Sequence, residues 1–335
     1  MSVALGLAER GLVPTPLLRH GIRRLCRQRL AEARAAGGVD AFLTALDGAP
    51  VAAVPELANA QHYEVPSRFY ELVLGHHRKY SSAIWPAGTD DLDSAEAAML
   101  ALTCERAGLA DGQDVLELGC GWGSLSLYMA GRYPNSRIVA VSNSATQRAF
   151  LDQRRPANLE IRTADMNHFD PGGQFDRIVS VEMFEHMRDW PTLLGRVAGW
   201  LRPGGSLFLH VFCHATLAYP FETEGADNWM GRHFFSGGIM PSFDLVPRLA
   251  PPGLALEEQW WLDGTHYQRT AAAWREHLET RRGQVMEVLR GHYGHAAETW
   301  YHRWRIFFLA CEELFGYAGG TEWGVGHYRL VRREG

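Results

Sequence analysis

The pattern of apolar and polar positions divides the chain into a helical start, an alternating middle and a mixed end. Residues 1–60 carry an approximate helical stripe, broken by glycine and proline. Residues 92–212 alternate short apolar runs with amphipathic segments, a pattern that predicts strands separated by helices. Residues 213–250 are rich in loop-forming and aromatic residues, and residues 270–318 are mainly helical in pattern.

The alternating middle predicts a parallel, doubly wound α/β sheet, whose ligands bind beyond the carboxyl ends of the strands. The predicted strands are 114–118, 137–141, 159–163, 175–181, 206–212 and a final strand at 323–332. The predicted helices are 92–107 (N-capped by Asp93 or Ser94), 122–132, 144–152 and 190–201. We expect four parts: an N-terminal helical extension (1–60), a Rossmann-like core with a preceding cap segment (61–212), a helical, aromatic substrate cover (213–322) and the final strand of the core sheet (323–335).

Composition indicates a soluble globular protein and excludes a disordered one. The chain has 335 residues, a hydrophobic share of 46% and a net charge of -5. Because no global positive field results, we expect no nucleic-acid partner. The basic run Arg23–Arg29 is interpreted as a solvated helix face, with a membrane or partner contact as the alternative. Scattered cysteines, and the lack of an apolar leader or span, predict a cytoplasmic protein and disfavour a membrane contact.

Three glycines follow the strand 114–118 and open a helix. Gly119, Gly121 and Gly123 provide a sharp turn whose backbone can approach a ligand without an intervening Cβ. A purely structural turn is the alternative, but the strand-turn-helix context favours a nucleoside site. The spacing differs from the G-x-G-x-x-G of dinucleotide folds, and no lysine follows as in a phosphate-binding loop.

The acids around this turn favour one cofactor. Glu117 lies beside the turn, where a carboxylate suits a cationic sulfonium. The second strand ends in Ser142 and Asn143, so neutral polar groups occupy the usual place of a ribose-binding acid. Asp165, followed by Met166, comes after the third strand, where a carboxylate can accept from an adenine amino group. We predict S-adenosylmethionine as cofactor and S-adenosylhomocysteine as product.

Ordered sequence blocks run from about residue 58 to the C-terminus. They are Gln61-His62-Tyr63-Glu64-Val65-Pro66, Lys79-Tyr80-Ser81-Ser82, the glycine turn, Ser142-Asn143-Ser144 with Gln147, Val181-Glu182-Met183-Phe184-Glu185-His186-Met187, Phe212-Cys213-His214, Phe234-Phe235 and Leu314-Phe315-Gly316-Tyr317. Together they resemble the cyclopropane-fatty-acid-synthase superfamily, and within it the coclaurine N-methyltransferases of plants. The resemblance implies a class I methyltransferase fold and a polar segment in place of the ribose acid. It also implies a cofactor site lined by Tyr80, Ser81, Gly119, Asn143, Gln147, Asp165 and Met166.

An acid-base cluster follows the strand 175–181. Glu182, Glu185 and His186 share one face if a helical turn begins there. An aliphatic amine, with a pKa of about 10, must lose a proton before its lone pair can attack a methyl group. We predict that Glu182 anchors the ammonium while Glu185 and His186 assist its deprotonation. The alternative is a capping Glu182 with a structural His186. A metal is not expected, because no metal-ligand spacing is present.

Two branches of the superfamily compete for the function, an amine N-methyltransferase and a lipid-modifying enzyme. Enzymes of the lipid branch look to use a bound bicarbonate, held in part by a Cys and by a Tyr late in the chain. Here Ser82 stands in place of the Cys, and the region of the Tyr is Ile306-Phe307-Phe308. Glu185 and His210 still match that branch, but Glu182 stands where it tends to have glycine. We favour the amine enzyme. A cyclopropane-fatty-acyl-phospholipid synthase or related lipid C-methyltransferase is the first alternative, and a catalytically silent cofactor-binding partner protein is the second.

The expected substrate is a small, aromatic, alkaloid-like amine, and a homodimer is an assembly that the sequence leaves open. Glu64 lies in a segment that resembles a cap over the active site, where it pairs with substrate or serves as an ordinary helix acid. Aromatic faces can hold a cation, although plain core positions are the alternative. The predicted pocket wall is Trp229, Phe235, Trp304 and Phe308, with His233 and Tyr267 as polar handles.

Overall fold

The structure is a computed structural model that describes residues 3–46, 50–52, 65–225 and 228–333. Glu64 and the block before it therefore lie outside the described residues. The strands are β1 (Asp114–Leu118), β2 (Arg137–Ser142), β3 (Leu159–Thr163), β4 (Phe175–Val181), β5 (Leu201–His214), β6 (Tyr219–Pro220), β7 (Ile239–Met240), β8 (Leu254–Asp263) and β9 (Trp323–Arg332).

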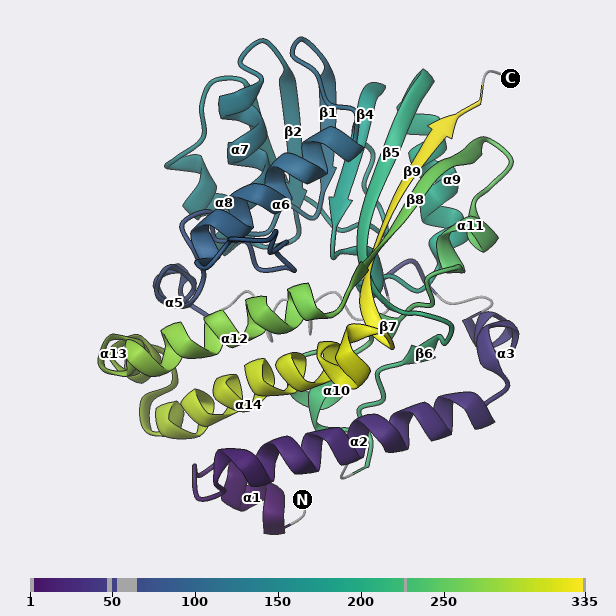
Figure 1. The fold of residues 1–335 in the computed structure, drawn as a ribbon. Helices are drawn as coiled ribbons and strands as arrows, with labels where there is room; N and C mark the ends of the chain where they lie inside the picture. Colours follow the sequence, from purple (N-terminus) through teal and green to yellow (C-terminus); the bar gives the residue numbers. More distant parts are fainter. Residues whose placement is uncertain (1–2, 47–49, 53–64, 226–227, 334–335) are drawn as a thin grey trace.

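Helices surround the sheet and form a separate layer below it (Figure 1). Before the sheet come α1 (Val3–Ala8), α2 (Thr15–Ala35), α3 (Gly38–Leu46), α5 (Ser67–Val73) and α6 (Leu92–Arg106). Within it come α7 (Ser124–Arg132), α8 (Ala145–Asp152), η1 (Phe184–His186) and α9 (Trp190–Trp200). The later helices are α10 (Trp229–His233), α11 (Leu245–Leu249), α12 (Thr265–Thr280), α13 (Arg282–Tyr293), η2 (Gly294–Ala296), α14 (Ala297–Phe315) and η3 (Tyr317–Gly320).

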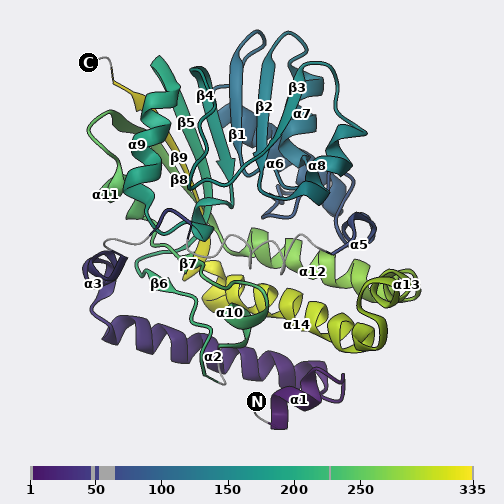
Figure 2. The same ribbon diagram turned by 180° about the vertical axis from the view of Figure 1, so that it is seen from behind.

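The main sheet has seven strands in the order β3-β2-β1-β4-β5-β9-β8. The first five are parallel, and β9 and β8 join antiparallel. The strand order reverses between β1 and β4, which is the switch point where ligands of open α/β sheets bind. Side chains of α6, α7 and α8 belong to the apolar cluster on one face. Those of α9 and α11 belong to the cluster on the other face, and Figure 2 shows α9 in front of the sheet there.

The predicted α/β fold is confirmed, and strands β1, β3, β4 and β9 have the predicted bounds. Strand β8 was missed because Glu257, Glu258 and Gln259 in its middle hide any apolar alternation, as is common on an edge strand. The segment expected to be a helical cover thus also contributes a strand to the sheet, and β5 spans residues 201–214 rather than the predicted 206–212.

Two helix starts also differ from the prediction. The side chain of Asp91, rather than Asp93 or Ser94, caps α6 by accepting from the Ser94 amide at 2.8 Å. Helix α7 begins at Ser124 rather than Trp122, because the left-handed Gly123 occupies its N-cap.

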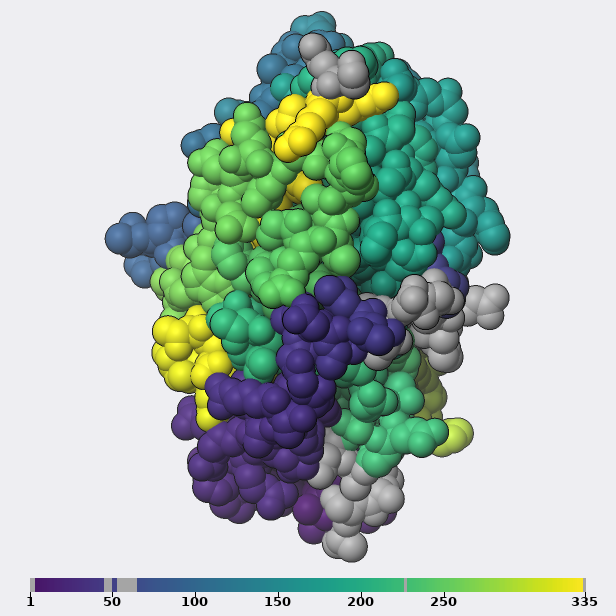
Figure 3. All heavy atoms as spheres, turned by 90° about the vertical axis from the view of Figure 1, so that its right-hand side faces the viewer, coloured from purple at the N-terminus to yellow at the C-terminus, as the bar shows by residue number. Residues whose placement is uncertain are grey.

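Helices α12, α14 and α2 lie one below another beyond the carboxyl ends of the parallel strands (Figure 1). The N-terminal helices form one flank of this helical half, as the purple spheres in Figure 3 show. Arg19 and Arg23 of α2 pair with Glu313 of α14, and Arg29 donates to the Asn228 side chain at 2.8 Å. The basic run is therefore only partly a solvated face, since it also fastens α2 to the helical layer.

Candidate active site

The glycine turn between β1 and α7 is built from three left-handed residues. Gly119, Gly121 and Gly123 have φ values of 85°, 52° and 79°, a region where a side chain is strained. A Cβ on Gly119 would lie 2.7 Å from the Met183 side chain, and one on Gly123 would collide with Leu151. Gly121 instead faces open space. Gly123 does not line the pocket and packs against Leu151, so its predicted role in binding stays a prediction.

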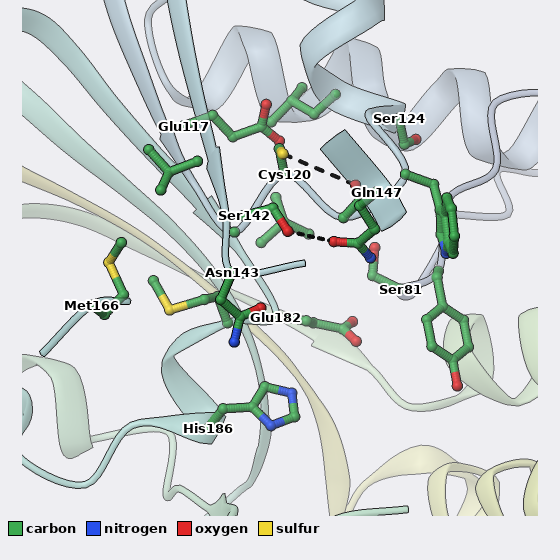
Figure 4. Close-up of a pocket in the computed structure, with 18 of the residues that line it drawn as sticks. Ser81, Glu117, Cys120, Ser124, Ser142, Asn143, Gln147, Met166, Glu182 and His186 are labelled. Atoms are coloured by element: carbon green, nitrogen blue, oxygen red, sulfur yellow. Dashed lines mark hydrogen bonds between the residues drawn. The ribbon is translucent and has the colours of Figure 1, made fainter. Parts of the chain in front are cut away.

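A pocket opens at the carboxyl ends of β1, β2 and β4, where the fold places its ligand site (Figure 4). The predicted cofactor and catalytic residues that line it are Tyr80, Ser81, Glu117, Gly119, Gly121, Ser142, Asn143, Gln147, Asp165, Met166, Glu182 and His186. Buried polar atoms also lack partners there within the described part of the chain. They are Thr103 Oγ1, Trp122 Nε1, Ser124 Oγ and Gln147 Nε2. Since buried polar atoms are normally satisfied, these atoms indicate a polar ligand.

The turn after β2 presents an amide to the pocket. The Ser142 hydroxyl donates to Gln147 Oε1 at 2.6 Å, which orients the amide nitrogen of Gln147 as a remaining donor. The Ser144 side chain caps α8 by accepting from the backbone N–H of Gln147. Across the pocket, Asp165 accepts from the Asn167 backbone at 2.9 Å. The turn therefore offers a donor where a ribose-binding acid was absent from the sequence.

Glu117 is a buried carboxylate at the end of β1. Burial raises its pKa to about 7, and the Ser126 hydroxyl donates to it. Among the described residues no cation pairs with this carboxylate. A positively charged ligand in the pocket would lower the pKa of Glu117 and stabilise its ionised form.

The turn after β4 places Glu182 in a left-handed conformation with a φ of 46°. Its amide donates to the His210 carbonyl of the neighbouring β5 at 2.8 Å. The short helix η1 then brings His186 round, with its amide donating to Met183 at 3.0 Å. Strained backbone at a non-glycine residue marks functional sites. The turn thereby directs Glu182 and His186 to the same side of the pocket, as Figure 4 shows.

Three protein donors hold the carboxylate of Glu182. The Ser82 amide and His210 Nε2 reach Oε1 at 2.8 and 3.1 Å, and the Tyr267 hydroxyl reaches Oε2 at 2.8 Å. Burial nevertheless raises the pKa of Glu182, against the opposing charge of Lys79 and these hydrogen bonds. The donors are matched to the ionised form of the carboxylate.

His186 is the second titratable group at this end of the pocket. Burial lowers its pKa to about 4, against the attraction of Glu182. The imidazole stacks on Phe235 with ring centroids 4.9 Å apart and planes at 17°. A neutral, fixed imidazole beside a carboxylate can accept a proton from a substrate.

Glu185, predicted to assist deprotonation, does not line the pocket, and its catalytic role stays a prediction. Its Oε1 accepts from the Phe212 amide at 2.7 Å, and its Oε2 is buried without a partner among the described residues. Burial and the nearby charge of Glu182 raise the pKa of Glu185 well above its ordinary value. The Glu185 carboxyl is thus fastened to the backbone of β5 behind the turn.

Most of the predicted aromatic wall packs in the core rather than in the pocket. Trp304 and Phe308 are fully buried on α14, and Trp229 donates its indole N–H to Glu9 at 2.8 Å. None of the four predicted wall residues lines the pocket, although Phe235 reaches its edge by stacking on His186. Trp304 and Phe308 instead face α5 and α12, because residues 306–313 of α14 are buried on every side.

The two residues predicted as polar handles lie in different parts of the structure. Tyr267 donates to Glu182, whereas His233 lies 3.8 Å from Glu9 at the remote N-terminal end.

Sequence reasoning missed several residues of the site. Trp122 and Ser124 line the pocket from within the glycine turn, and Lys79 lines it next to the predicted Tyr80. Their adjacency to named motifs was a usable signal. Ser236 also lines the pocket, and no local pattern around it pointed there.

Searches of the described residues found no cluster of three metal-ligating side chains, and no helix apolar and long enough to cross a bilayer. The predicted cytoplasmic location and homodimer stay predictions.

Comparisons with known proteins agree with this geometry. The profile of the mycolic acid cyclopropane synthetase family matches residues 54–319. An (S)-coclaurine N-methyltransferase from Thalictrum flavum subsp. glaucum is 34% identical over 295 residues, covering 84% of this chain and 81% of that relative. A cyclopropane-fatty-acyl-phospholipid synthase from Escherichia coli strain K12 is 33% identical over 222 residues, covering 66% of this chain and 56% of that enzyme.

Solved structures give the same picture. A coclaurine N-methyltransferase bound to N-methylheliamine and S-adenosylhomocysteine has a TM-score of 0.92 to this chain, at 32% identity and with 99% of each chain covered. A cyclopropane synthase from Mycobacterium tuberculosis has a TM-score of 0.71 at 24% identity, covering 83% of this chain and 99% of that one. The latter likeness concerns the fold alone.

Proposed function

Because the chain belongs to the mycolic acid cyclopropane synthetase family and is an S-adenosylmethionine-dependent methyltransferase, we propose that it methylates the nitrogen of a small, aromatic, alkaloid-like amine. The observation that carries this proposal is the pair of Glu182 and His186, which line one side of the cofactor pocket. An anionic carboxylate beside a neutral imidazole suits an acceptor that arrives as an ammonium and must react as a free amine.

The pocket fits the cofactor. The unpartnered donors of Trp122 and Gln147 suit ribose or carboxylate oxygens, and the carboxylates of Glu117 and Asp165 accept from cationic or amino groups. When bound, S-adenosylmethionine supplies an electrophilic methyl group on a sulfonium. Membership of the family thus accounts for the methyl donor, and the residues at the other end of the pocket decide the methyl acceptor.

Glu182 and His186 divide the handling of the acceptor. The fixed carboxylate of Glu182 provides the counter-charge that draws an ammonium into a buried site. One N–H proton of the ammonium passes to this pair, where the carboxylate lowers the cost of charging His186. The nitrogen lone pair is then free, and general-base assistance of this kind contributes about 10²–10⁴-fold. Glu185 lies behind the turn, where it accepts from the Phe212 amide, so we assign this transfer to Glu182 and His186.

The lipid alternative is supported by the family profile, by the similarity to a bacterial cyclopropane-fatty-acyl-phospholipid synthase, and by Glu185 and His210, which match that branch. Ser82, which stands where that branch has a cysteine ligand, argues against it, because its hydroxyl donates to the neighbouring Ala83 carbonyl at 3.1 Å and the residue does not line the pocket. Its backbone amide donates to the carboxylate of Glu182.

A two-arm assay tests the proposal. The protein is incubated with S-adenosylmethionine and a panel of benzylisoquinoline, phenylethylamine and indolethylamine compounds, each beside its alcohol isostere. Mass spectrometry should find methylated amines and unchanged alcohols. The second arm offers vesicles of unsaturated phospholipid with bicarbonate. Cyclopropanated or methylated lipid, with no methylated amine from the panel, would overturn the proposal. Cofactor binding without turnover in either arm would favour the silent partner protein.

A further inference from the structure

A line of hydrogen bonds runs from the carboxylate of Glu182 along one face of the sheet to the half-buried Arg106. His210 Nε2 lies 3.1 Å from Glu182 Oε1, and His210 Nδ1 lies 2.9 Å from His327 Nε2. His327 Nδ1 in turn lies 2.9 Å from a guanidinium nitrogen of Arg106. Both imidazoles are fully buried, whereas Arg106 at the end of α6 is half-buried. We call these three residues the histidine chain.

The register of the sheet builds the histidine chain. His210 of β5 and His327 of β9 are directly paired residues of the antiparallel ladder, so their side chains stand together on one face. The same face carries α6, whose last residue is Arg106. Arg106 is held over the Trp260 ring of β8 at 4.7 Å. Four separate elements thus fix one line of polar atoms.

The direction of every hydrogen bond in the histidine chain follows from its outer end. A guanidinium has only donors, so His327 Nδ1 must accept from Arg106. A neutral imidazole carries one proton, which then lies on His327 Nε2 and is donated to His210 Nδ1. By the same reasoning His210 carries its proton on Nε2 and donates it to Glu182. Burial and the positive charges of Lys79 and Arg106 lower the pKa of both imidazoles well below the ordinary value, which keeps them neutral.

We propose that Arg106 and His327 are positioning residues of the methyl transfer, which act through His210 to keep Glu182 ionised and oriented for the substrate ammonium. This inference rests on the proposed function for its substrate, but not for the state of Glu182. The histidine chain supplies an N–H whose hydrogen bond is stronger to the ionised carboxylate than to the protonated one. It therefore opposes the rise in the pKa of Glu182 that burial causes. It extends the site to residues that touch neither cofactor nor pocket.

Other charged and titratable groups around Glu182 also influence its pKa. Lys79 lowers the pKa of Glu182 electrostatically, as His186 would when protonated, and the Ser82 amide and Tyr267 hydroxyl lower it by hydrogen bonding. Glu185 is the neighbouring acid. Among the described residues, none of these groups is hydrogen-bonded to His327 or Arg106, so a change at either position leaves their bonds to Glu182 in place.

The polarity of the histidine chain also distinguishes it from a proton exit. An outgoing proton would have to enter His210 at Nε2, which already bears one, and would end at a guanidinium that cannot accept it. The chain therefore orients a charge and does not discharge the proton released on methylation.

Substitutions at His327 separate orientation from packing. The amide of His327→Gln can accept from Arg106 with its oxygen and donate to His210 with its nitrogen, whereas His327→Leu can do neither. The pKa of Glu182 is measured by carbon NMR of labelled carboxylates without any amine, with the signal assigned through Glu182→Gln. We expect it to rise by about one unit in His327→Leu, the effect of one lost hydrogen bond to a charged group, and to stay in place in His327→Gln.

Activity gives the second readout if the amine assay is positive. The acid limb of the kcat/KM profile should move to higher pH by the same amount in His327→Leu, while the Kd for S-adenosylmethionine stays unchanged. A purely structural role would lower the Tm in both variants and leave the acid limb in place. Equal shifts in the two variants, or no shift of the Glu182 pKa in either, would overturn the inference. A failure of the amine assay alone would leave the carboxylate measurement intact and would count against the proposed function only.

Arg106 provides a variant pair at a half-buried position, in case His327→Leu does not fold. Arg106→Lys keeps an obligate donor and should retain the Glu182 pKa, whereas Arg106→Leu should raise it. Arg303 is the matched control, because it is a half-buried arginine that lies 5.0 Å from the Trp300 ring and pairs with Glu9, away from the histidine chain. Arg303→Leu should leave the Glu182 pKa in place. A rise as large as that in Arg106→Leu would assign the effect to general charge and overturn the proposal.

Discussion

Two turns at the ends of the neighbouring strands β1 and β4 build the site, and they meet the same backbone demand in different ways. Both need left-handed residues. The β1 turn has glycines at every such position, while the β4 turn uses Glu182 with a φ of 46°. The buried carboxylates beside them differ too, since Glu117 has one hydroxyl donor and Glu182 has three donors. Where the backbone alone serves the ligand, glycine suffices, and where a side chain must act, the protein retains it despite the strain.

The largest effect should come from filling the β1 turn. In Gly121→Val the new side chain would project into the open space of the pocket from a left-handed backbone. Cofactor binding should be lost, which calorimetry with S-adenosylmethionine would measure. A control at Gly172, a left-handed glycine with nothing near its Cβ position and remote from the pocket, should bind normally as Gly172→Ala. Undiminished affinity in Gly121→Val would show that the turn does not hold the ligand.

The β4 turn should affect turnover rather than cofactor binding. Glu182→Gln removes the counter-charge for the ammonium, so kcat/KM should fall by about 10²–10⁴-fold while the Kd for S-adenosylmethionine stays nearly constant. Glu312→Gln is a matched control, because Glu312 is a buried carboxylate paired with Arg19 and Arg275 in the helical layer. If both variants lost the same activity, the role of Glu182 would be structural.

The buried carboxylate of Glu117 also predicts a pH dependence of the free energy of unfolding. The pKa of Glu117 rises from 4.5 to about 7 on folding, so the folded state binds more protons between these values. The contribution of Glu117 is therefore most favourable below pH 4.5 and declines by about 3 kcal/mol as the pH rises to 7. Glu117→Gln should flatten this slope in urea unfolding of the cofactor-free protein. A variant with the wild-type slope would contradict the burial of an ionisable Glu117.

The smallest effect isolates the strain in the β4 turn. Glu182→Gly and Glu182→Ala both lack the carboxylate and differ only in their tolerance of a left-handed backbone. Glycine should be more stable than alanine there by about 1 kcal/mol, the reverse of the usual order within strands. Ser180, two residues earlier in β4, gives the comparison with extended backbone, and its alanine variant should exceed its glycine variant in stability. Alanine more stable than glycine at position 182 as well would mean that the turn is relaxed.

Much of the fold followed from local patterns, because the parallel strands are short apolar runs bounded by helices. The pattern failed at β8, whose central polar residues face outward on the edge of the sheet. The cofactor turn was equally local, since glycine spacing directly encodes its backbone. The position of the aromatic residues, in contrast, did not follow from local sequence. Trp304 and Phe308 gave the same signal as pocket residues would, and only the packing of α14 assigned them to the core.

The sequence by itself determined the α/β order, the glycine turn and the triplet of Glu182, Glu185 and His186, since each depends on residues close together in the chain. Only the tertiary structure decided which acid of that triplet is available. Glu182 meets donors from residues 82, 210 and 267, whereas Glu185 is enclosed against β5. The histidine chain likewise required β5 to pair with β9 across more than a hundred residues. The pKa of a buried group depends on neighbours that folding brings from distant parts of the chain, and no local pattern records them.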